Sequence, residues 1–126
     1  MANHAVGLYN SRMRLVLLAG AIAIVVACGQ TTLEPLPLDI SLQASRTTAA
    51  AGDTIAFVAT VQGGSLLGLD ADYGDSTTDQ FAAGGARTGK VTFLHAYRVR
   101  GTYTTTITVT DATASRKSST IQIRVN

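Results

Sequence analysis

The chain has 126 residues, of which 46% are hydrophobic and 14% charged, and its formal net charge is +2. Soluble domains carry about 25% charged residues, so this composition excludes a long disordered polyelectrolyte, and the length suits one domain with a hydrophobic core. The single cysteine excludes an internal disulfide framework and a cysteine-rich zinc site.

The first 27 residues have the features of a secretory signal. An uncharged apolar run over residues 15–27 follows Arg12 and Arg14. As a helix, this run would extend about 20 Å at ~1.5 Å per residue, which is less than the ~30 Å hydrocarbon core of a bilayer. We therefore predict a cleaved signal over residues 1–27, with Met1 or Met13 as the translation start.

The signal ends at the cysteine. The segment Val25-Val26-Ala27-Cys28 resembles the lipobox of bacterial lipoproteins, in which the cysteine carries diacylglycerol and becomes the first residue of the mature chain. The resemblance implies that Cys28 anchors the protein in a membrane, and Gly29 in place of Asp implies the outer membrane of a Gram-negative envelope. Lipidation also accounts for an unpaired thiol in an exported protein. An ordinary signal with a chance cysteine, or an uncleaved anchor, is the alternative.

Residues 28–37 are expected to form a tether. They contain both prolines of the chain, Pro35 and Pro37, which lack the backbone donor that a central strand or a helix needs. Fully extended at ~3.3 Å per residue, this segment would reach about 30 Å. We expect it to separate a folded domain, residues 38–126, from the lipid surface.

From residue 38 onward, apolar and polar residues alternate with the period of two that is typical of half-buried strands. Strands are expected within residues 38–43, 54–61, 67–73, 91–97, 103–110 and 121–125, with glycine-bearing breaks between most of them. This pattern predicts an all-β, Ig-like antiparallel β-sandwich of about seven strands. Its core is expected to contain Phe57, Leu69, Phe93, Ile107, Val109 and Ile123.

Two motifs in this domain resemble those of a known family. Residues 71–78 (ADYGDSTT) resemble the W-D-F-G-D-G-T motif of the PKD (polycystic kidney disease) domain, an Ig-like sandwich, with Ala71 in place of Trp and Ser76 in place of Gly. Because Ala71 is small, we expect Leu67, Leu69 and Phe93 to fill the space beneath it.

The second motif is the more specific one. His95-Ala96-Tyr97, Gly101-Thr102-Tyr103 and residues 104–111 resemble the H-x-Y … G-T-Y-T-V-T-L-T-V-T-D stretch of the same family, and the likeness covers about residues 38–125. It implies a spacer or interaction module at a cell surface, in some proteins one that helps enzymes engage insoluble polymers. It also implies structural roles for Tyr73, Gly74, Asp75, His95, Tyr97, Gly101 and Tyr103.

One tyrosine is expected to form the tyrosine corner of an Ig-like sandwich, in which its hydroxyl bonds to backbone a few residues upstream. Tyr103 follows Gly101 at the start of a predicted strand, but Tyr97 could take the same role. Both alternatives remain open at this point.

Four aspartates are the main concentration of metal-binding groups: Asp70, Asp72, Asp75 and Asp79. Calcium binds six to eight oxygens, and the spacing of these residues does not match an EF-hand loop. Alternation places the first two on the solvent side of a strand, while the others lie in or beyond a turn. We expect these carboxylates to accept backbone N–H groups of the turn, with calcium binding as the alternative. No other cofactor is expected.

No enzymatic machinery is expected. His95 is the only histidine after residue 27, no G-x-S-x-G motif is present, and Cys28 is assigned to the anchor. The glycine-rich residues 81–89 (FAAGGARTG) lack a Walker lysine and are expected to form a flexible connection.

The sequence therefore predicts a non-catalytic, membrane-anchored envelope lipoprotein whose PKD-like domain binds or spaces a protein or a polysaccharide. The alternative is a structural accessory subunit of an envelope assembly that docks by strand addition. A carbohydrate-binding module is less expected, because the chain has no Trp. No nucleic-acid partner is expected, since two of the ten basic residues lie in the leader and the other eight equal the eight acidic residues in number.

Overall fold

The structure, a computed structural model, describes residues 35–126. Its elements are β1 (Asp39–Ala44), β2 (Thr48–Ala49), β3 (Thr54–Gln62), β4 (Leu66–Asp72), β5 (Thr78–Ala82), β6 (Thr88–Ala96), β7 (Gly101–Asp111) and β8 (Arg116–Val125). Within residues 35–126 there is no helix that could span a membrane. The predicted signal, the alternative start Met13 and the predicted lipidation site Cys28 lie outside the described residues.

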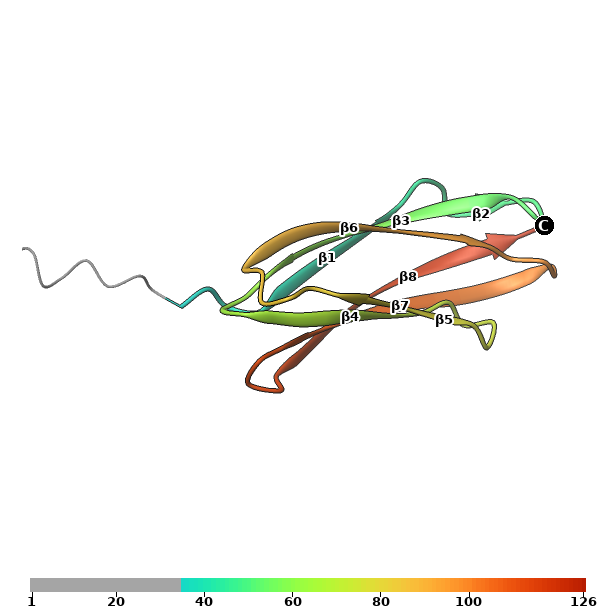
Figure 1. Cartoon of the computed structure of the whole chain (residues 1–126). Coiled ribbons are helices and arrows are strands. Elements are labelled where there is room, and N and C mark those ends of the chain that lie inside the picture. The colour runs from blue at the N-terminus through green and yellow to red at the C-terminus, as the bar shows by residue number, and fades with distance from the viewer. Residues whose placement is uncertain (1–34) are drawn as a thin grey trace, which may run out of the picture. The chain divides into compact units, whose positions relative to one another are not determined.

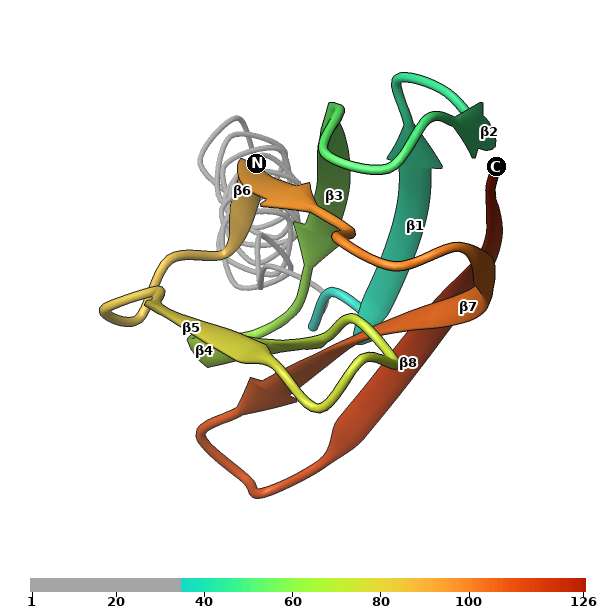
Figure 2. The same cartoon turned by 90° about the vertical axis from the view of Figure 1, so that its right-hand side faces the viewer.

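The strands form two sheets that face each other (Figure 1). One sheet has the order β1-β3-β6, and the other has the order β2-β8-β7-β4-β5. Every pairing is antiparallel except the short parallel contact of β2 with β8. The chain crosses between the sheets after β1, β2, β3, β5 and β6, and Figure 2 shows the sandwich along its length. This arrangement confirms the predicted Ig-like sandwich.

The core lies between the two sheets and comes from alternate residues of each strand. All six predicted core residues are at most 6% exposed: Phe57, Leu69, Phe93, Ile107, Val109 and Ile123. Because the whole core cluster belongs to the compact unit Pro35–Asn126, this segment contains what a domain needs to fold by itself. The start of β1 and the C-terminus lie at opposite ends of the sandwich (Figure 1).

The side-chain orientation predicted for the start of β4 is wrong. Leu66 is fully buried and Leu67 is 54% exposed, although the sequence pattern placed Leu67 in the core. The pairing of β4 with β7 shifts between Leu66 and Gly68, and such a bulge changes the face on which the following residue lies. Leu67 therefore does not fill the space beneath Ala71.

The glycine-rich connection is shorter than predicted. Phe81 and Ala82 belong to β5, and Thr88 and Gly89 belong to β6, so only residues 83–87 connect the two strands. All residues of β5 are exposed, and the strand therefore lacks the apolar alternation that predicted the others. Its backbone lies very close to β4, because a Cβ atom at Gly68 would be 2.7 Å from the Phe81 carbonyl oxygen.

Candidate functional site

The first motif forms the turn between β4 and β5. Asp72 Oδ1 accepts a hydrogen bond from the Gly74 N–H at 2.9 Å, and Asp75 Oδ1 accepts one from the Thr77 N–H at 3.1 Å. The Thr77 hydroxyl also donates to Asp75 Oδ1. Each carboxylate thus accepts the N–H of the residue two positions further on, as Asp side chains do in Asx turns.

Two residues of this turn have a left-handed backbone. Gly74 has φ of 78°, and a Cβ atom there would lie 2.6 Å from the Thr104 carbonyl oxygen, so only glycine fits. Ser76 has φ of 71° and occupies the position at which the PKD motif has Gly. A side chain in this conformation is strained by roughly 1–2 kcal/mol.

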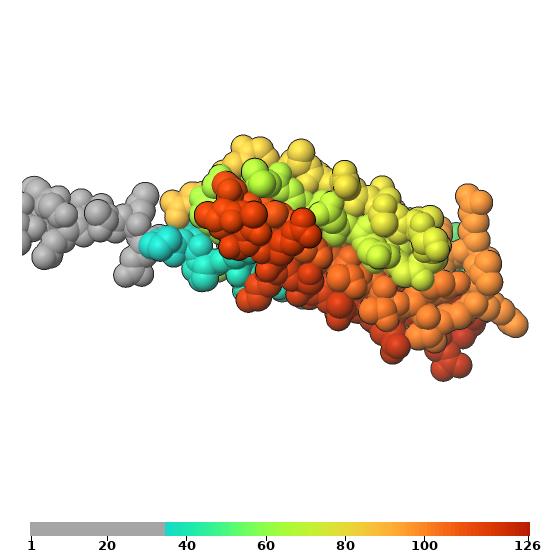
Figure 3. Space-filling view, turned by 90° about the horizontal axis from the view of Figure 1, so that it is seen from below, coloured from blue at the N-terminus to red at the C-terminus, as the bar shows by residue number. Residues whose placement is uncertain are grey.

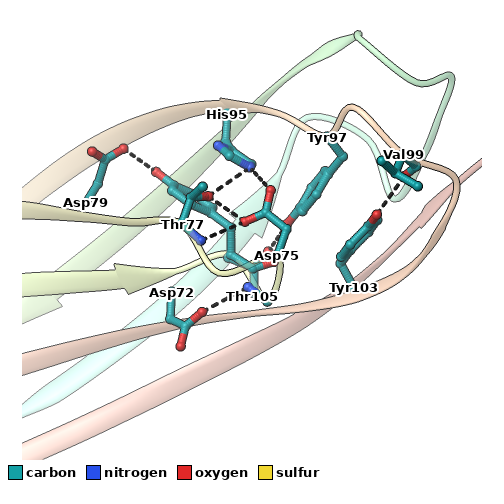
Figure 4. A network of polar contacts seen from close by, with 11 residues as sticks. Asp72, Asp75, Thr77, Asp79, His95, Tyr97, Val99, Tyr103 and Thr105 are labelled. Carbon is teal, nitrogen blue, oxygen red and sulfur yellow. Dashed lines mark hydrogen bonds and ion pairs between the residues drawn. The ribbon is translucent and has the colours of Figure 1, made fainter.

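His95 links the end of β6 to this turn (Figure 4). Its Nε2 lies 2.7 Å from Asp75 Oδ2, its ring stacks on Tyr73 with centroids 3.9 Å apart, and its ring meets Tyr97 edge-on at 4.8 Å. Burial raises the pKa of Asp75, but hydrogen bonds from Thr77 and His95 outweigh this effect and lower the pKa overall. The pair therefore favours the ionised carboxylate.

Tyr97 and Thr105 form the buried part of the network. Their hydroxyl oxygens are 2.6 Å apart, and the Tyr97 hydroxyl also donates to the Tyr73 carbonyl at 2.9 Å. Tyr97 is 1% exposed and Thr105 is fully buried. Burial raises the pKa of Tyr97. This hydroxyl pair joins β6, β7 and the end of β4 inside the sandwich.

Tyr103 forms the tyrosine corner. Its hydroxyl donates to the carbonyl of Val99, four residues upstream, at 2.6 Å, and its ring stacks on Tyr97 with centroids 4.3 Å apart. Tyr97 instead bonds to the carbonyl of Tyr73, directly after β4, and to the side chain of Thr105 in β7. Gly101 begins β7, and a Cβ atom there would lie 3.6 Å from the Tyr103 ring.

The four aspartates do not converge on one point. Asp79 accepts a hydrogen bond from the Tyr73 hydroxyl at 2.7 Å, and burial followed by this bond raises the pKa of Tyr73. Asp72 and Asp75 bond to the turn, and Asp70 is exposed on β4. Residues 35–126 contain no group of three or more His, Cys, Asp or Glu side chains that could hold a metal ion.

The His95–Asp75 pair does not have the geometry of a catalytic triad. In a triad, the acid and the nucleophile contact opposite nitrogens of the imidazole ring. Here the Thr77 hydroxyl lies 3.4 Å from Nε2, the same atom that contacts Asp75. The network therefore holds the turn between β4 and β5 against the end of β6.

A second candidate site lies on the surface of β4 and β5. Two neighbouring hollows, of about 440 Å³ and 390 Å³, share Asp70 and Gln80 in their linings. At one end Leu67 and Phe81 are 54% and 46% exposed. We call the site the β5 edge surface, and Figure 3 shows the face of the sheet on which it lies, with β4 and β5 in green and yellow. It is defined by Leu67, Asp70, Asp72, Asp79, Gln80 and Phe81.

Sequence reasoning missed Gln80 and Phe81 as surface residues of a strand. Phe81 was placed in a flexible connection, and Gln80 carried no motif. The two threonines Thr77 and Thr78 are the signal that could have found them, because β-branched residues favour strands and β5 begins at Thr78.

Comparisons with known proteins agree with this fold. Residues 39–125 match a family described as PKD domain. The PKD domain of a peptidase from a Thermoplasmatales archaeon is 18% identical, with a TM-score of 0.60 over 72% of this chain and 94% of that one. A CARDB domain from Pyrococcus furiosus, described as in complex with di-metal ions, is 15% identical, with a TM-score of 0.54 over 75% and 97%.

A sporulation control protein from Bacillus subtilis is 12% identical, with a TM-score of 0.52 over 71% of this chain and 49% of that one. These identities are low, so the solved structures establish a common fold alone. A comparison with curated proteins gives no significant match.

Proposed function

Because the chain belongs to the PKD domain family, we propose that it is a non-catalytic interaction or spacer module that a lipid anchor holds on the bacterial cell envelope. The observation that best supports this proposal is that its polar residues fall into two groups, one with internal contacts and one exposed to solvent. The motif residues Tyr73, Asp75, His95 and Tyr97 make their polar contacts within the turn and the core, and these include the bond from Tyr73 to Asp79. The β5 edge surface is exposed and is a site available for contact.

The anchor half of the proposal depends on Cys28. Each buried methylene of an acyl chain contributes about 0.8 kcal/mol, so two or three chains on one cysteine give a stable attachment where a single chain would exchange. Residues 28–37 would then act as the tether, since β1 begins at Asp39.

The anchor is tested with Cys28→Ser. We expect this variant to accumulate as an unprocessed precursor without lipid, and we expect the wild-type mature chain to begin at a lipidated Cys28 in intact-mass analysis. An unmodified Cys28 in the wild-type protein would refute the anchor and leave the interaction module untouched.

The interaction half is tested by cross-linking in whole cells, with photo-reactive groups placed on β5 and, as a control, on exposed positions of β8 such as Thr120. An interaction module gives reproducible cross-linked products that depend on the labelled position. A single product of fixed stoichiometry would favour the alternative function, an accessory subunit of an envelope assembly, which the free edge of β5 also supports.

A carbohydrate-binding role has less support. Stacking platforms for sugars need exposed aromatic rings, and among the exposed large hydrophobic residues of the described chain only Phe81 is aromatic. Binding on a glycan array that is lost in Phe81→Ala would reverse this preference.

A further inference from the structure

Strand β5 presents unpaired backbone groups at the edge of the five-stranded sheet. Its pairing with β4 is bracketed by two bonds, from the Tyr73 N–H to the Thr77 carbonyl at 3.2 Å and from the Ala83 N–H to the Leu67 carbonyl at 2.8 Å. In an antiparallel pair, residues that bond across the ladder alternate with residues that do not. The register therefore directs the N–H and C=O groups of three residues away from β4: Thr78, Gln80 and Ala82.

This edge is also incompletely covered on its apolar side. Phe81 pairs with Leu69 and so lies on the inner side of the sheet, yet it is 46% exposed. The edge strand β6 of the other sheet lies on the same flank of the sandwich (Figure 2). A strand added beside β5 would place its inward side chains next to Phe81, because strands lie about 4.8 Å apart.

The charge on the two strands at this edge is acidic. Strands β4 and β5 carry Asp70, Asp72 and Asp79 and no Lys or Arg. Asp70 and Asp72 lie on the outer face of β4, opposite Gln80 and Thr78 of β5. A second copy of β5 would bring the same acids to this edge, and their repulsion disfavours pairing between copies.

We propose that the edge of β5 binds an extended segment of a partner protein in which apolar residues alternate with Lys or Arg, and that this segment adds to the sheet as a further strand. Its backbone bonds to Thr78, Gln80 and Ala82, its apolar side chains cover Phe81, and its basic side chains reach across β5 toward Asp70 and Asp72. This inference rests on the proposed function and names the partner chemistry of its interaction half.

The test uses ¹⁵N-labelled residues 35–126 and a synthetic peptide of alternating Lys and Val, with a Glu-Val peptide of the same length as control. We expect the Lys-Val peptide to shift the amide signals of Thr78, Gln80 and Ala82 and to slow their hydrogen exchange. The Glu-Val peptide should leave these signals unchanged, since its charges oppose those of the edge.

Two sets of variants locate the interaction. Gln80→Pro removes an outward N–H at an edge position, where proline is tolerated, and should abolish peptide binding, while Gln80→Ala should keep it. The double variant Asp70→Asn and Asp72→Asn should weaken binding several-fold and reduce its salt dependence. Thermal unfolding of each variant verifies that the domain is folded.

The proposal is overturned if the peptide shifts other sheet edges instead, if Gln80→Pro binds as well as Gln80→Ala, or if the peptide has no effect. It is also overturned if the domain dimerises through β5, because the occupant is then a second copy. If the peptide does not bind but cross-links persist in cells, the edge of β5 is rejected as the binding site and the interaction function stands. If no cross-links form at all, the proposed interaction function itself is rejected.

Discussion

The Tyr97 hydroxyl offers a sharp test of how the buried network stabilises the fold. It bonds to the Tyr73 carbonyl and to the Thr105 hydroxyl, and no buried side-chain polar atom in residues 35–126 lacks a partner. Replacing Tyr97 with Phe leaves two polar groups with one partner fewer inside the sandwich. A buried polar group without its partner costs about 1–3 kcal/mol, so we expect Tyr97→Phe to lower the free energy of unfolding by about 2 kcal/mol.

The assay is thermal and urea unfolding of residues 35–126 followed by circular dichroism. For a domain of this size, a loss of about 2 kcal/mol corresponds to a fall in Tm of about 10 °C. Tyr103→Phe is the matched control, because it removes a bond to the carbonyl of the exposed residue Val99, which water can replace. We expect Tyr103→Phe to lower the free energy of unfolding by less than about 1 kcal/mol.

A double variant separates the hydroxyl pair from other effects. Thr105→Val keeps the shape of the side chain and removes the second hydroxyl. In the Tyr97→Phe background this substitution should lower the free energy of unfolding by less than it does in the wild type. Equal destabilisation by Tyr97→Phe and Tyr103→Phe, or strictly additive costs in the double variant, would refute the reasoning.

The remaining predictions concern the turn and the core. Ser76→Gly should stabilise the domain by about 1 kcal/mol in urea unfolding, because glycine relieves the left-handed backbone, while Ser76→Ala should give no such gain. Because the pKa of Asp75 is lowered by folding, its contribution to stability is present above the ordinary value of 3.8 and is lost as the pH falls below it. The free energy of unfolding of Asp75→Asn should therefore depend less on pH below 3.8 than that of the wild type. Ile107→Ala should cost about 2–5 kcal/mol and Thr106→Ala under ~1 kcal/mol, and equal costs would contradict the observed orientation of β7. Millimolar calcium should leave the Tm unchanged, and a rise of several degrees that chelator reverses would show that the aspartates bind it after all.

Alternation predicted the strands whose two faces differ most. In β3 and β7, every second residue over much of the strand is buried, so the sequence pattern and the core agree. In β5 all residues are exposed, and β4 is the one strand that pairs with it, so no hydrophobic pattern could indicate this strand. Leu66 and Leu67 are chemically identical, so only the bulge decides which of them is buried.

The candidate network was predictable in its residues but not in its contacts. The family resemblance pointed to Tyr73, Asp75, His95 and Tyr97, yet the bond between Asp75 and His95 joins residues that are 20 positions apart. Local patterns cannot pair such residues, because the sandwich topology brings them together. The choice between Tyr97 and Tyr103 for the corner also required the strand ends to be placed in space.

The opposite placement of the start of β1 and the C-terminus has a mechanical consequence. Tension applied between the two ends of the domain enters through β1 and β8, the strands that carry them, and pulls along the length of the sandwich (Figure 1). The ladders of β1 with β3 and of β8 with β7 are then loaded in shear, so their bonds resist together and do not open one after another. The domain is thus oriented to transmit a pull along its length as a stiff link.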